Sequence, residues 1–77
     1  MKMTVTSTGK LVEFNGLPAR VWEGTTERGV PVLAFVTRVA VPESVGPQEL
    51  AVFELELAEQ TPPSPAVEAW PARMVLD

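Results

Sequence analysis

The alternation of apolar and polar residues predicts an antiparallel sheet in the first half of the chain. Residues 3–8 alternate and are rich in threonine and valine, which is typical of a short strand. Residues 1–9 could equally form an ordered N-terminal arm. We expect Gly9 to end this segment and residues 10–14 to form the next strand.

Two turn signals then connect the predicted strands into a meander. Asn15-Gly16 predicts a tight hairpin turn, because both residues tolerate positive φ. The return strand is predicted over residues 17–25, and residues 26–29 predict a second loop that ends in glycine. The valine-rich residues 30–41 predict the third and longest strand.

Residues 47–60 fit a helix better than a strand, although both patterns are present. Pro47 suits the first helical position, and the segment is rich in good helix formers. Three large apolar side chains recur at the spacing of one helical face, namely Leu50, Phe53 and Leu57. The strict alternation of residues 53–57 would instead suit a strand, so that alternative stays open.

The C-terminal part predicts a proline-rich connection over residues 61–66, since three prolines there continue neither element. Ser64 can cap a short turn, and residues 73–76 predict a last strand that returns to the sheet. The predicted fold class is α+β: a small antiparallel meander with one helix packed on it and a C-terminal strand. The alternative, if residues 50–58 form a strand, is an all-β barrel of five strands.

The two turns also predict a strand register, with Thr25 opposite Val30 and Val21 opposite Ala34. Side chains alternate across a strand, so this register makes both faces of the sheet apolar. One face would hold Val12, Phe14, Leu17, Ala19, Val21, Val30, Val32, Ala34 and Val36. The other would hold Leu11, Arg20, Trp22, Leu33, Phe35, Val39 and Val41. One helix covers one face only, so we expect a second copy, another protein or the N-terminal arm to cover the other.

Six residues are candidates for an interaction surface: Arg20, Trp22, Leu33, Phe35, Arg38 and Trp70. Tryptophan is enriched at binding hot spots, although a core or dimer contact is the plainer interpretation of Trp22. The arginines interrupt apolar segments. Each either reaches the sheet edge or a glutamate, or presents its charge to a partner.

The charge is unevenly distributed. The net charge is −4, but residues 1–40 carry five bases and three acids, whereas residues 41–77 carry one base and seven acids. A net acidic chain disfavours direct binding to nucleic acid. A candidate acidic surface consists of Glu49, Glu54, Glu56 and Glu59.

The composition offers little for catalysis. We expect residues 1–77 to form a single domain. The sequence includes no cysteine, histidine or tyrosine, and its only aspartate is Asp77. No nucleophile–base pair, metal-ligand spacing or phosphate loop is present, so we expect no enzyme activity, no cofactor and no metal. No apolar run reaches the roughly 18 residues of a membrane helix and no secretion signal is evident, which favours a bacterial or host cytoplasm and no membrane partner.

Four segments resemble a group of small uncharacterised proteins that bacteriophages and prophages encode. They are residues 14–26 (FNGLPARVWEGTT), 29–31 (GVP), 35–41 (FVTRVAV) and 71–76 (PARMVL). The resemblance implies a phage or prophage origin and brings no catalytic motif.

Three hypotheses about function follow from these patterns. The first is a non-enzymatic protein-interaction module that binds a host or phage protein. The second is a homodimeric accessory or structural phage protein, whose second apolar face is used in self-association. The third is an acidic mimic of nucleic acid that inhibits a bacterial defence enzyme.

Overall fold

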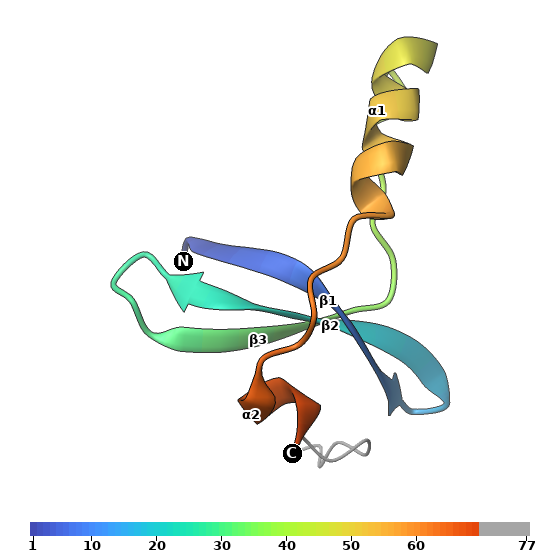
Figure 1. The fold of residues 1–77 in the computed structure, drawn as a ribbon. Coiled ribbons are helices and arrows are strands. Elements are labelled where there is room, and N and C mark those ends of the chain that lie inside the picture. The colour runs from blue at the N-terminus through green and yellow to red at the C-terminus, as the bar shows by residue number, and fades with distance from the viewer. Residues whose placement is uncertain (70–77) are drawn as a thin grey trace.

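The computed structural model describes residues 1–69, which form a three-stranded antiparallel sheet and two helices. The strands are β1 (Met3–Phe14), β2 (Leu17–Thr26) and β3 (Pro31–Val36), in the sheet order β1-β2-β3. Helix α1 spans Pro47–Leu57 and the short helix α2 spans Pro65–Glu68. Figure 1 shows the two helices on opposite sides of the sheet. The α+β class, the meander and the helix are confirmed, and the barrel alternative is wrong because α1 occupies the segment that it needed as a strand.

The first hairpin forms where the sequence predicts it. Asn15 and Gly16 both adopt positive φ, at 48° and 82°, and Phe14 pairs with Leu17. These left-handed conformations match the right-handed twist of the flanking strands.

The predicted strand break at Gly9 is wrong, because residues 3–14 form one strand. The pairing with β2 shifts between Ser7 and Leu11, so the chain bulges there and then continues. The Thr8 side chain stabilises the bulge: its hydroxyl donates to the carbonyl of Val21 at 2.7 Å and accepts from the N–H of Lys10. Residues 3–8 therefore belong to the sheet.

The predicted register of β3 is wrong by one residue. Thr25 lies opposite Pro31, and Val21 lies opposite Phe35. The cause is Thr26, whose side-chain oxygen accepts from the N–H of Val30 while its own N–H donates to the carbonyl of Val30. Thr26 thereby extends β2, and the loop moves by one residue to residues 27–30.

This shift moves Leu33 and Phe35 to the opposite face from the one predicted. They pack against the buried residues Val12, Ala19 and Val21, and the rings of Phe14 and Phe35 meet edge to face with centroids 5.1 Å apart. We call this side the core face. The other side, the groove face, carries Leu11, Arg20, Trp22, Val32, Ala34 and Val36.

The third strand ends at Val36, not at residue 41 as predicted. Continuing the same register would set Arg38 opposite Pro18, which has no N–H to donate to the ladder. The chain leaves the sheet after Val36 and runs through residues 37–46 to α1.

The helix that covers the sheet is α2, so the prediction that the helix of residues 47–60 packs on it is wrong. Val67 of α2 is 2% exposed and completes the core, and the Ser64 hydroxyl caps α2 by accepting from the N–H of Val67. Helix α1 has no buried residue and extends away from the sheet (Figure 1). The predicted strand at residues 73–76 lies outside the described residues.

A short bridge to β1 fixes where α1 ends. Thr61 pairs in parallel with Thr8, the N–H of Thr61 donates to the carbonyl of Ser7 at 3.0 Å, and the Ser7 hydroxyl donates to the carbonyl of Glu59. These bonds attach the segment after α1 to the edge of the sheet and not over its face.

Candidate interaction groove

A groove of about 600 Å³ lies between the groove face and the C-terminal end of α1. We call it the sheet groove. Its lining along β1 and β2 is mostly apolar, with Ser7 and Arg20 as the polar residues, and Thr37 to Ala40 form its other wall. The lining residues are Ser7, Leu11, Pro18, Ala19, Arg20, Trp22, Val36, Thr37, Arg38, Val39, Ala40, Leu57 and Gln60.

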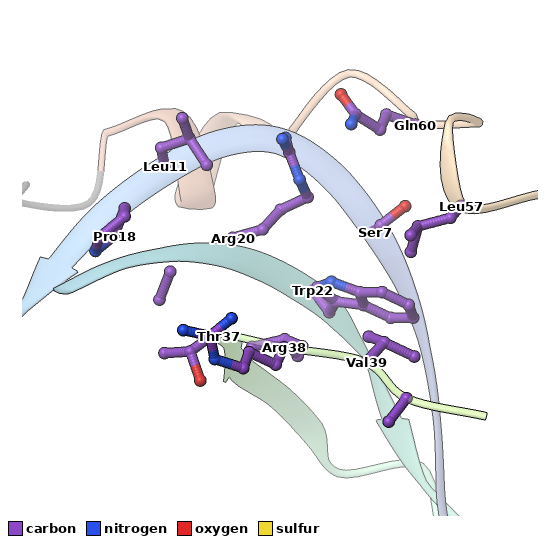
Figure 2. A pocket seen from close by; sticks show the side chains of 13 residues that line it. Ser7, Leu11, Pro18, Arg20, Trp22, Thr37, Arg38, Val39, Leu57 and Gln60 are labelled. Carbon is purple, nitrogen blue, oxygen red and sulfur yellow. The ribbon is translucent and has the colours of Figure 1, made fainter. Parts of the chain in front are cut away.

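Trp22 occupies the middle of the groove. Its position opposite Ala34 on the central strand exposes the ring to the groove face, where it is half-buried. Figure 2 shows the indole between Leu57 on one side and Val39 on the other. An aromatic side chain set among aliphatic ones and open to solvent is a typical anchor for a binding partner.

Arg20 has a structural bond in addition to its place in the groove. Its Nη1 donates to the carbonyl of Thr8 at 3.0 Å, and Figure 2 shows the side chain reaching toward β1. The guanidinium satisfies a carbonyl that the bulge leaves outside the regular ladder, and its remaining N–H groups can still face a ligand.

Arg38 lies beyond the end of β3, on the other wall of the groove from β1 (Figure 2). Its side chain is exposed. Among the described residues, the two arginines are the only charged side chains in the lining of this groove, and none of them is a carboxylate. A second hollow adjoins the groove at Trp22, and there Glu56 and Glu59 take part in the lining. The positive end of the surface is therefore the end away from α1.

The exposed side of α1 is unusually apolar. At about 100° per residue, Leu50, Phe53 and Leu57 form one stripe, and Val52 and Leu55 form a second stripe on the other side. The first stripe touches the sheet only near its end, where Phe53 and Leu57 line the hollows beside Trp22. The second stripe is the more exposed of the two, with Val52 54% and Leu55 72% exposed.

The predicted acidic surface does not form one face. Glu49, Glu54, Glu56 and Glu59 are all exposed. Glu54 and Glu56 are two residues apart on α1, so their side chains diverge by about 160° around the helix. The carboxylates flank the apolar stripes and do not form a continuous charged surface.

The structure brings three of the six predicted interaction residues together, namely Arg20, Trp22 and Arg38. Leu33 and Phe35 lie on the core face instead, and Trp70 lies outside the described residues. Sequence reasoning missed the second stripe of α1, although the positions of Val52 and Leu55 on a helical wheel signal it.

No protein-family model, no curated protein and no solved structure matches this chain. Residues 1–69 contain no helix with the length and apolarity needed to cross a membrane. Within the same residues, no three acidic side chains cluster in a way that could hold a metal ion.

Proposed function

We propose that the chain is a protein-interaction module that works without catalysis and binds through α1 and the sheet groove. The observation that carries this proposal is that α1 is apolar but uncovered. It has no buried residue, and four of its large apolar side chains are exposed, namely Leu50, Val52, Leu55 and Leu57. A helix of 11 residues is marginally stable alone in water and depends on burial of an apolar face. A partner that covers α1 would supply this burial.

The resemblance described above implies a phage or prophage origin. With that origin, the partner would be a host or phage protein, and the chain would act in the cytoplasm of a bacterial host. A homodimeric accessory protein is the second candidate, because the same exposed helix and groove would serve self-association. The acidic-mimic hypothesis has less support, since Glu54 and Glu56 diverge on α1.

A capture experiment with matched variants tests the proposal. The full chain is immobilised as wild type, as Leu55→Lys and as Val30→Lys, and the proteins retained from a bacterial lysate or from added free chain are compared. Lysine is a good helix former, and Val30 is an exposed valine in the turn between β2 and β3. We expect Leu55→Lys alone to lose the retained protein. Equal retention by both variants, or no retention of any protein, would contradict the proposal.

A further inference from the structure

We propose that the partner of α1 is a second copy of this chain, with the helix of each protomer docked in the sheet groove of the other. This inference rests on the proposed function, because it names the partner for the same two surfaces. Each copy would complete the surface that the other leaves open.

Charge complementarity is the first reason to choose a second copy. Within residues 1–69, the lining of the sheet groove contains Arg20 and Arg38 and no carboxylate. Helix α1 carries three glutamates and no basic residue. Opposite charges on the two surfaces favour their encounter and fix their relative orientation. The helix of this chain therefore has the charge that its groove would select.

The exposed stripe of α1 is the second reason. Leu55 lies about 200° around the helix from Leu57, and Leu57 is the residue that lines the groove of its own chain. The stripe of Val52 and Leu55 thus faces away from its own sheet. A second protomer can cover it with the exposed Leu11 and Val39 and the half-buried Trp22, which combines aliphatic and aromatic burial.

The attachment of α1 makes docking in its own groove difficult. Backbone bonds between Thr61 and both Ser7 and Gly9 hold the segment after the helix at the edge of β1. Each chain consequently offers one helix and one groove. A two-fold dimer, in which each surface is used once by the partner, satisfies both.

A charge exchange between two variants tests this arrangement. Full-length Arg38→Glu and Glu56→Lys are studied by sedimentation velocity over a dilution series, each alone and then mixed, because Glu56 lies only about 40° around the helix from Val52. In each variant alone, both interfaces would place like charges together, so we expect the dissociation constant to rise by about 10- to 100-fold. In the mixture, Glu56 meets Arg38 in one interface and the two exchanged charges meet in the other, so we expect dimerisation to return.

The matched control is the pair Arg28→Glu and Glu27→Lys, which makes the same charge changes in the exposed turn between β2 and β3. We expect no effect from it, alone or mixed. A wild-type chain that stays monomeric at every concentration would overturn the proposal and assign α1 to another occupant, the chain's own residues 70–77 included. A dimer that is unaffected by Arg38→Glu would also overturn it, since the groove would then not be the docking site.

The two proposals fail in different ways. A monomeric chain that still captures another protein through Leu55 would overturn the second-copy partner and leave the interaction module in place. A monomeric chain whose Leu55→Lys variant retains the same proteins as wild type would overturn both.

Discussion

At the scale of single residues, the bend of β1 depends on one hydroxyl. Thr8 is 0% exposed and bonds both to the carbonyl of Val21 and to the N–H of Lys10. The sequence alone suggested a break at Gly9, because a glycine in a strand pattern indicates either an end or a bulge. Which of the two forms depends on a contact between residues 13 positions apart, and local pattern does not contain that contact.

We predict that Thr8→Val destabilises the fold by about 1–3 kcal/mol, because the similar shape is kept while two buried polar groups lose a partner. Thr6→Val is the control, since Thr6 is exposed on the same strand. Urea denaturation followed by circular dichroism measures the difference in the free energy of unfolding. Equal urea midpoints for Thr8→Val and Thr6→Val would show that the Thr8 hydroxyl contributes nothing to the free energy of unfolding.

Gly24 marks the closest approach between two strands. A Cβ atom at this position would overlap the carbonyl oxygen of Thr4 on β1. We predict that Gly24→Ala destabilises the fold by about 2 kcal/mol or more, since backbone atoms cannot move aside as a side chain can. A Cβ at Gly9 meets open space, so Gly9→Ala should stay within about 0.5 kcal/mol of wild type. Thermal unfolding that ranks the two alanine variants equally would be inconsistent with the packing of β1 on β2.

The register of β3 shows why the sequence predicts the shared face of Arg20 and Trp22 correctly but places Leu33 and Phe35 on the wrong face. The segment from Val30 to Val36 is apolar at both odd and even positions, so alternation does not decide which residues face the core. The turn decides it, through the hydroxyl of Thr26. Arg20 and Trp22 lie on β2, whose pairing the Asn15-Gly16 turn fixes, and their shared face was predicted correctly.

At the scale of elements, the helix predicted to pack on the sheet, α1, has no buried residue, and the short helix α2 covers the core instead. The sequence predicts the position of α1 well, because Pro47 and the helix-forming composition are local signals. It does not predict where α1 packs, since apolar residues occur on two sides of this helix. The short turn after Ser64 covers the core face instead, and Glu23 supports it by accepting from the N–H of Ser64 at 2.8 Å.

We predict that Val67→Ala and Val52→Ala, the same change in α2 and in α1, differ strongly in effect. Val67 is 2% exposed and completes the core, so its truncation should cost about 2 kcal/mol. Val52 is 54% exposed, so its truncation should cost less than about 0.5 kcal/mol in the monomer. Chemical denaturation at a concentration below that of self-association gives both values. A larger loss for Val52→Ala would mean that α1, and not α2, is the helix packed on the sheet.

At the scale of the whole molecule, the uneven charge becomes a spatial arrangement. The basic half of the sequence forms the sheet, and the acidic half forms α1 and the segment after it. We predict that self-association weakens by about three- to tenfold between low and high salt, because exposed charges are screened over a few ångströms in concentrated salt. Sedimentation velocity at several ionic strengths measures this, and association that strengthens with salt would indicate a purely apolar interface.

Hydrogen exchange of the α1 amides at several protein concentrations shows whether a second chain covers this helix. We expect slow exchange across Leu50 to Leu57 in concentrated samples and fast exchange on dilution, with the β1–β2 ladder unchanged, because an isolated helix of this length is marginal in water. Exchange in α1 that is slow at every concentration would show instead that its own chain covers the helix, and α1 would then not be a docking element.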